Sequence, residues 1–355
     1  MRSTASITAT ATWQTTLADY VTAIAWSPNG HWLAAASAAG EVMMGSPPGQ
    51  LIALRSPQNA AISSLAFSAD SQFLAAVGQA GEVTVWQVAS SAHRIQWQQT
   101  YAGVWLDQLA WHPQQNLLAV GVGSQVELWQ IPTGDRLASL DFQASSVLNL
   151  VWHPSGDSLA VSGHGGIKVW QTHQWQKAAQ LIQVPGASIA AAWSQEGRYL
   201  GSGNLDRTLT VVEWGSPPPW LMQGFPGKVR QVCWSMPPTS GSAPLLAAAC
   251  AEGITVWERE TTQRGWRSRV LQHHQDTVIA IAFQPHSQLL ASASREGQIA
   301  LWQNGKQLAQ TLKNFRQGVS CLVWHPAGDR LVVGGSAGKL QIWHLTQRQA
   351  KGFGA

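Results

Sequence analysis

The chain has 355 residues, of which 45% are hydrophobic, 20 are Trp and only 11% are charged. Its net charge is +4 at pH 7, and its 22 Lys and Arg are scattered rather than gathered in runs, which argues against a nucleic-acid-binding tract. No apolar run approaches the ~18 residues of a membrane span, and the first residues lack the continuous apolar stretch of a secretory signal. We therefore expect a cytoplasmic protein without a membrane span that is a monomer on its own.

The chain opens with an alternating Thr-rich segment, ITATATWQTTL, which has the pattern of an edge strand. Eight copies of one unit follow, and their first strands are expected to start near residues 21, 62, 106, 147, 188, 229, 278 and 319. An aromatic residue ends each first strand, and the steps between these residues are 41, 44, 41, 41, 41, 49 and 41. They are Trp26, Phe67, Trp111, Trp152, Trp193, Trp234, Phe283 and Trp324. Such a period identifies a repeat protein.

The seventh unit shows the pattern most clearly. VIAIAF, LLASAS and QIALW are apolar and β-branched runs, separated by QPHSQ and REG, whose Pro, Ser and Gly favour turns. Three short strands with two apolar faces are not stable alone, so each unit must pack against its neighbours.

This unit resembles the WD40 repeat, a four-stranded propeller blade with a period of about 40 to 45 residues. A Trp ends the third strand at Trp86, Trp129, Trp170, Trp257, Trp302 and Trp343, whereas Gly45 and Val212 stand there in blades one and five. Gln, Glu or His replaces the Asp that follows this Trp in the family. The resemblance implies an all-β fold: a closed eight-bladed β-propeller of four-stranded antiparallel blades, forming one domain over residues 1–355.

The last unit has no evident fourth strand of its own after Trp343. We expect residues 5–17 to complete it, because a strand exchanged between the two ends closes the ring and removes its open edges.

In the WD40 family a His, a Ser or Thr, an Asp and the third-strand Trp are joined by hydrogen bonds. Blade seven comes nearest to this set, with His274, Ser292 or Ser294, Glu296 in place of the Asp, and Trp302. Blade five keeps only the turn Asp, as Asp206. We therefore expect the other blades to depend on packing.

Three units carry a Trp-His-Pro triplet, at His112, His153 and His325, and His286 lies in the corresponding turn of blade seven. A ring of imidazoles would suit a metal-handling or hydrolytic propeller, which is one alternative function. We instead expect these histidines to be turn residues, and we expect no catalytic residue, no cofactor and no metal site. Cys233, Cys250 and Cys321 are too few and too irregular for a zinc cluster or a disulfide framework.

The resemblance implies a non-enzymatic scaffold that binds protein partners. The expected surface is the top face, which carries the turns between second and third strands and the segments before the first strands. Lys228, Arg230, Arg295 and Glu296 would form a mainly basic patch there, suited to an acidic segment of a partner. A reader of an anionic polymer or lipid is the second alternative. The candidate residues are Tyr20, Trp105, Asp107, Asp206, Lys228, Arg230, Arg295, Glu296 and Lys339.

Overall fold

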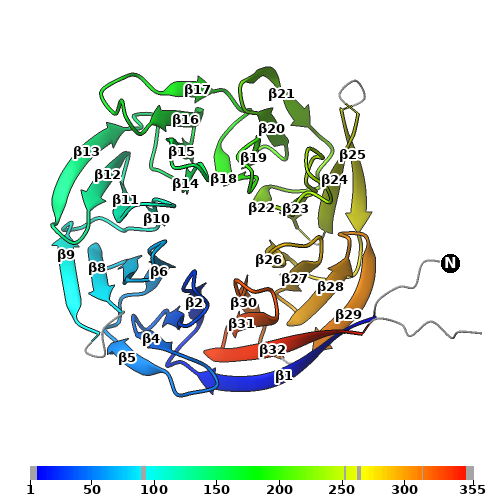
Figure 1. The fold of residues 1–355 in the computed structure, drawn as a ribbon, viewed down its shortest axis with the longest axis horizontal. Helices are drawn as coiled ribbons and strands as arrows, with labels where there is room; N and C mark the ends of the chain where they lie inside the picture. Colours follow the sequence, from blue (N-terminus) through cyan, green and yellow to red (C-terminus); the bar gives the residue numbers. More distant parts are fainter. Residues whose placement is uncertain (1–5, 89–92, 252, 262–264, 314, 349–355) are drawn as a thin grey trace, which may run out of the picture.

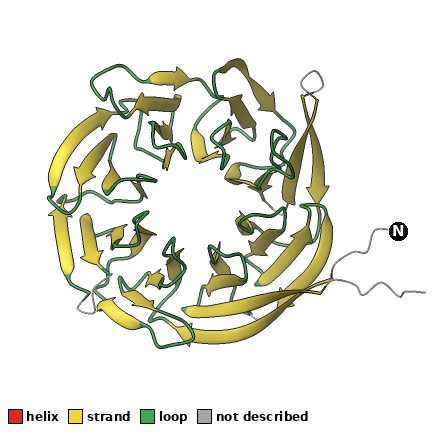
Figure 2. Cartoon of the chain, in the orientation of Figure 1, coloured by secondary structure: helices red, strands yellow, loops and turns green. Residues whose placement is uncertain are grey.

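The structure, a computed structural model, describes residues 6–88, 93–251, 253–261, 265–313 and 315–348. Its strands form eight four-stranded antiparallel sheets, arranged as blades around a central opening (Figure 1). Every element of the described residues is a strand or a loop (Figure 2), and none is a helix that could cross a membrane. The expected eight-bladed propeller is confirmed.

The four strands of a blade follow one another outward from the opening. The first strands are β2 (Val21–Trp26), β6 (Ile62–Phe67), β10 (Leu109–Trp111), β14 (Asn149–Trp152), β18 (Ser188–Trp193), β22 (Val229–Trp234), β26 (Val278–Phe283) and β30 (Val319–Trp324). The second strands are β3 (Leu33–Ser37), β7 (Phe73–Gly78), β11 (Leu117–Val122), β15 (Ser158–Gly163), β19 (Tyr199–Asn204), β23 (Leu246–Cys250), β27 (Leu290–Ser294) and β31 (Arg330–Gly335). The third strands are β4 (Val42–Gly45), β8 (Glu82–Gln87), β12 (Gln125–Gln130), β16 (Gly166–Gln171), β20 (Leu209–Glu213), β24 (Gly253–Thr261), β28 (Gln298–Gln303) and β32 (Lys339–Arg348). The outer strands are β5 (Ile52–Arg55), β9 (Ile95–Thr100), β13 (Asp135–Asp141), β17 (Gln180–Ile182), β21 (Ser216–Met222), β25 (Gly265–Leu271), β29 (Gln307–Lys313) and, for blade eight, β1 (Ser6–Thr16).

Six first strands start at the residues expected from the sequence, but those of blades three and four start later, at Leu109 and Asn149 instead of 106 and 147. In these two blades, pairing with the second strand begins only at Leu109, opposite Val120, and at Asn149, opposite Ser162. The earlier positions bind the preceding blade, since Leu106 N–H donates to Gly78 O and Val147 N–H donates to Gly123 O. Val278 N–H makes the same kind of contact with Ala251 O, so this contact is not specific to the two late strands.

The N-terminal strand closes the ring. β1 pairs antiparallel with β32, from Ser6 opposite Arg348 to Thr16 opposite Lys339. On its other side, the amide of Gln310 in β29 accepts a hydrogen bond from Ala9 N (2.7 Å) and donates one to Ala9 O (3.2 Å). The Gln310 amide thus forms the two hydrogen bonds that a neighbouring strand backbone would form with Ala9. It links β1 to blade seven, whose outer strand β29 lies beside β1 in Figure 1.

Neighbouring blades are joined near the opening by the tryptophans that end the first strands. Four of their indole nitrogens donate to a carbonyl in the first strand of the preceding blade, at 2.9 to 3.0 Å. The pairs are Trp111 with Ala66, Trp152 with Ala110, Trp234 with Ala192 and Trp324 with Ala282. In these four blades the residue before the neighbouring aromatic supplies the acceptor that a buried indole N–H needs. Nε1 of Trp26 and Nε1 of Trp193 have no partner among the described residues.

Candidate protein-interaction surface

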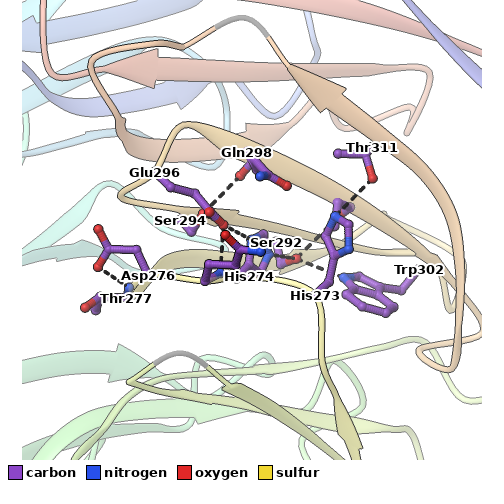
Figure 3. A network of polar contacts seen from close by, with 12 residues as sticks. His273, His274, Asp276, Thr277, Ser292, Ser294, Glu296, Gln298, Trp302 and Thr311 are labelled. Carbon is purple, nitrogen blue, oxygen red and sulfur yellow. Dashed lines mark hydrogen bonds and ion pairs between the residues drawn. The ribbon is translucent and has the colours of Figure 1, made fainter.

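Blade seven contains the hydrogen-bonded set that its sequence suggests (Figure 3). Trp302 Nε1 donates to Ser292 Oγ at 2.9 Å, and Ser292 Oγ lies 2.8 Å from His274 Nε2. His274 Nδ1 lies 3.5 Å from Glu296 Oε1, and the imidazole is 1% exposed. Burial and the neighbouring His273 lower the pKa of His274 to about 4, although Glu296 opposes the shift. A neutral imidazole therefore connects the top turn of this blade to its third strand.

Glu296 is occupied inside this blade. Its Oε1 accepts hydrogen bonds from Gln275 N and Ser294 Oγ, both at 3.0 Å. Of the two serines considered from the sequence, Ser292 therefore meets the histidine and Ser294 meets the glutamate. These contacts fit Glu296 to the structural role expected for it, and all of them engage Oε1.

Blade five contains a second buried polar network, which the sequence analysis missed. Ser188 Oγ lies 2.7 Å from Ser202 Oγ, which donates to Asn204 Oδ1 at 2.8 Å. Asn204 Nδ2 donates to Thr208 Oγ1 at 2.9 Å, and Thr208 Oγ1 donates to Asp206 Oδ1 at 2.8 Å. The expectation that all blades other than blade seven depend on packing is wrong for this one. A signal was present, because Ser202 stands two residues after Leu200, as Ser292 stands after Leu290.

The turn histidines, His112, His153 and His325, bind the next blade. Each Nε2 lies 3.0 Å from a glycine carbonyl in the corresponding turn of that blade, at Gly156, Gly197 and Gly30 respectively. Backbone N–H groups donate to the Nδ1 atoms at 3.1 to 3.2 Å. In blade seven Gln284 replaces the histidine and donates from Nε2 to Gly328 O at 2.6 Å.

These contacts bear on the metal-handling alternative. In His112, Nε2 donates to Gly156 O and Nδ1 accepts from Gln114 N and Gln115 N, so the neutral imidazole has no free lone pair for a metal. Burial favours this neutral form in His112, because it lowers the pKa of that imidazole. His325 is held differently, because its Nδ1 also lies 2.8 Å from Asp329 Oδ1 and its Nε2 lies 2.6 Å from Arg330 Nη2. Among the residues that the structure describes, no three His, Cys, Asp or Glu side chains are grouped to hold a metal ion. His286 is exposed and lies two residues after Gln284, which stands where the other three turns carry their histidine.

The top face exposes two large aromatic side chains. Trp105, before the first strand of blade three, is 67% exposed, and Tyr20, before that of blade one, is 38% exposed. Burial of its hydroxyl raises the pKa of Tyr20, with a further contribution from Cys321, while Arg295 of blade seven opposes the shift.

The exposed charges of the top face are divided between two halves of the ring. Blades five to eight carry mainly cations, whereas the side chains exposed before the first strands of blades one and three include Asp19 and Asp107. The cations are Arg207, Lys228, Arg230, Arg295 and Arg316, accompanied by the exposed Asp206. We call these five cations the basic arc. Lys339 is engaged within blade eight, where its Nζ lies 5.2 Å from the centroid of the Phe315 ring.

Lys228 and Arg230 are two residues apart, and simple alternation along a strand would place both side chains on one side. A register shift lies here, however, with Val229 opposite Cys250 and Gln231 opposite Ala249. Arg230 is the extra residue of this β-bulge, so alternation does not relate the two side chains. Both are exposed nonetheless.

Two residues of the basic arc, Arg207 and Arg316, were not among the candidates expected from the sequence. The φ of Arg207 is +69°, a left-handed conformation that Gly40, Gly81, Gly297 and Gly338 adopt in the same turn of sister blades. An arginine in place of glycine there costs backbone energy, on the order of 1 kcal/mol. The replacement of a turn glycine by Arg207 is visible when the repeats are aligned, and it could have pointed to this turn.

The order of the strands and the closure by β1 define a WD-type β-propeller. Five segments match the family described as WD domain, G-beta repeat, at residues 10–44, 49–87, 134–171, 265–303 and 306–344, and together they cover more than half of the chain. The chain belongs to the WD40 repeat family.

Two further similarities were found. The chain is 29% identical over 106 residues to Protein CIA1 of Arabidopsis thaliana, a match that spans 28% of each protein. The crystal structure of the computationally designed Ika8 protein superposes with a TM-score of 0.74 at 20% identity, covering 93% of this chain and 97% of that one. At this identity the superposition shows the fold alone.

Proposed function

We propose that this propeller is a non-enzymatic cytoplasmic scaffold that binds a protein partner through its top face. The observation that carries the proposal is the basic arc, because only 11% of the residues in this chain are charged. Arg, Trp and Tyr are the residue types that dominate binding hot spots, and Trp105 and Tyr20 stand on the same face. Membership of the WD40 family, whose propellers typically bind proteins, supports the same conclusion.

The arc favours a partner segment rich in Asp and Glu. Such a segment would run over blades five to eight, while Trp105 offers an apolar contact across the opening, since β10 and β26 lie on opposite sides of it (Figure 1). Charge complementarity of this kind raises the association rate and selects among partners. A reader of an anionic polymer or lipid would use the same cations, so the two functions must be separated by experiment.

The test combines Lys228→Glu with Arg230→Glu and identifies bound proteins by quantitative affinity purification from the native host. The matched control combines Arg94→Glu with Lys177→Glu, which makes the same change in charge at exposed residues beside the turns between third and outer strands, on the opposite face. We expect the top-face pair to lose an acidic partner and the control pair to keep it, with equal melting temperatures.

Either of two results would refute the proposal. One is that both pairs capture the same proteins as the unchanged chain. The other is that anionic vesicles or an oligonucleotide bind the purified protein more tightly than the captured partner does, in which case the second alternative replaces it.

A further inference from the structure

A second surface lies on the rim, away from the top face. A groove of about 790 Å³ runs between the β24–β25 hairpin of blade six and blade seven. Residues 267–271 of β25 line it on one side, and Gln288, Asn304 and Lys306 line it on the other. Because five consecutive residues of β25 line the groove, the strand borders it along its length, together with Glu258 of β24 and Leu245.

The hairpin projects beyond its blade. β24 pairs with β23 only as far as Trp257, opposite Leu246, and its residues from Glu258 onward pair with β25 alone. Figure 1 shows this pair of strands extending along the rim. Arg259 anchors it to blade five: its guanidinium lies 4.2 Å from the centroid of the Trp220 ring, and Nη1 lies 3.5 Å from Glu213 Oε2. An anchored hairpin holds the edge of β25 in position.

The groove carries excess positive charge. Arg267 and Arg269, two residues apart in β25, are joined by Lys306 from the turn between β28 and β29. Glu258 is the one carboxylate in the lining; it contacts Arg269, and its Oε2 lies 3.7 Å from Arg267. Arg267 also pairs with Glu260, whose Oε1 lies 2.9 Å from Arg267 Nη1. Each guanidinium has five N–H donors, so the two arginines retain donors that Glu258 and Glu260 do not use. Lys306 is exposed and forms no ion pair with any described residue.

The free edge and the charges together select one kind of ligand. β25 is the outermost strand of blade six, and its edge away from β24 pairs with no described strand. An unpaired edge is a template for an added strand. Val270 is 61% exposed beside the two arginines, so acidic and apolar positions would alternate along a chain that paired here.

We propose that this groove binds an extended acidic segment of a partner protein, which adds to blade six as a fifth strand alongside β25. Carboxylates at alternate positions of the segment meet Arg267, Arg269 and Lys306, and the apolar positions between them cover Val270. The site is separate from the basic arc, and the proposal does not depend on the function of the top face.

The first test measures fluorescence anisotropy with a labelled synthetic peptide that alternates Glu with Val. A peptide of the same pattern with Lys in place of Glu is its control. Arg269→Glu and Lys306→Glu should each weaken binding of the acidic peptide about tenfold or more. Lys306→Glu is the stricter variant, because Lys306 forms no ion pair with a described residue whose loss could unfold the hairpin. Lys228→Glu with Arg230→Glu should leave the affinity unchanged, so failure here and failure at the top face are told apart.

The second test separates strand addition from simple charge attraction. Methylation of alternate backbone nitrogens removes the N–H groups that a ladder needs but keeps every carboxylate. We expect the methylated peptide to lose binding. Equal binding of the two peptides would overturn the proposal, as would unchanged affinity of the Lys306→Glu protein. Tighter binding of a single-stranded oligonucleotide than of the acidic peptide would also overturn it, in favour of a phosphate-binding groove.

Discussion

His153 of blade four donates a hydrogen bond from Nε2 to the carbonyl oxygen of Gly197 in blade five, at 3.0 Å. The same imidazole packs edge-on against Trp193, with 4.7 Å between ring centroids. Gly197 has a φ of +75°, and a Cβ atom there would lie 2.2 Å from His153 Nε2. Only glycine therefore lets the imidazole approach this close, and one repeat supplies the histidine while the next supplies the space.

Replacing His153 by Ala should destabilise the ring by about 1–3 kcal/mol, because a buried carbonyl loses its donor and the Trp193 ring loses a neighbour. Denaturant unfolding measures the change in the free energy of unfolding. His286→Ala is the control, since that imidazole is exposed in the corresponding turn of blade seven, and it should change stability by less than about 0.5 kcal/mol. Equal effects of the two substitutions would contradict a bracing role.

Stability should fall as the pH is lowered from about 6.5 to about 4, in part because of His274. Its pKa is lowered from 6.5 to about 4 in the folded chain, so the unfolded chain binds the proton more readily over this interval. Acid therefore favours unfolding over this interval. Above pH 6.5 His274 is neutral in both states, and its contribution to the free energy of unfolding is fully present. A shift of this size corresponds to roughly 3 kcal/mol.

Measuring the free energy of unfolding against pH for the unchanged chain and for His274→Gln checks this contribution. The variant should be less stable at neutral pH and show a shallower slope between pH 4 and 6.5. Parallel curves for the two proteins would show that His274 does not cause the acid sensitivity.

Trp302→Phe should cost more stability than Trp86→Phe. Both indoles are buried at the end of a third strand, but Trp302 Nε1 donates to Ser292 Oγ, whereas Trp86 Nε1 has no partner among the described residues. The two substitutions remove similar apolar area, so the difference between them reports the hydrogen bond and should be about 1 kcal/mol. Thermal unfolding of both variants measures it, and an inverted order would show that packing outweighs the bond.

Deleting residues 1–16 should lower the melting temperature and promote self-association, because the edge of β32 would lose its partner strand. Size-exclusion chromatography with light scattering follows the association. Gln310→Ala offers a milder comparison, since it removes two hydrogen bonds to Ala9 but leaves the pairing of β1 with β32 in place. A truncated chain that stays monomeric and melts at the same temperature would disprove the role of this strand in closure.

The number of blades could be predicted from the amino-acid sequence, because each unit repeats its own turn residues, its alternating strands and its aromatic anchors within about 41 residues. The closure could also be predicted, since an unpaired strand at one end matched a missing strand at the other. In the blade-seven network, His274, Ser292 and Trp302 lie within one repeat, where the family pattern can be compared position by position. The blade count and the blade-seven network depend on contacts internal to a unit, whereas the closure followed from matching the two ends of the chain.

Contacts between units could not be inferred from the repeat pattern. The partner of His153 lies 44 residues along the chain, and the groove beside β25 forms where blade six meets blade seven. Strand patterns follow from backbone geometry within one blade, whereas hydrogen bonds and clefts between blades depend on how two finished sheets stack against each other.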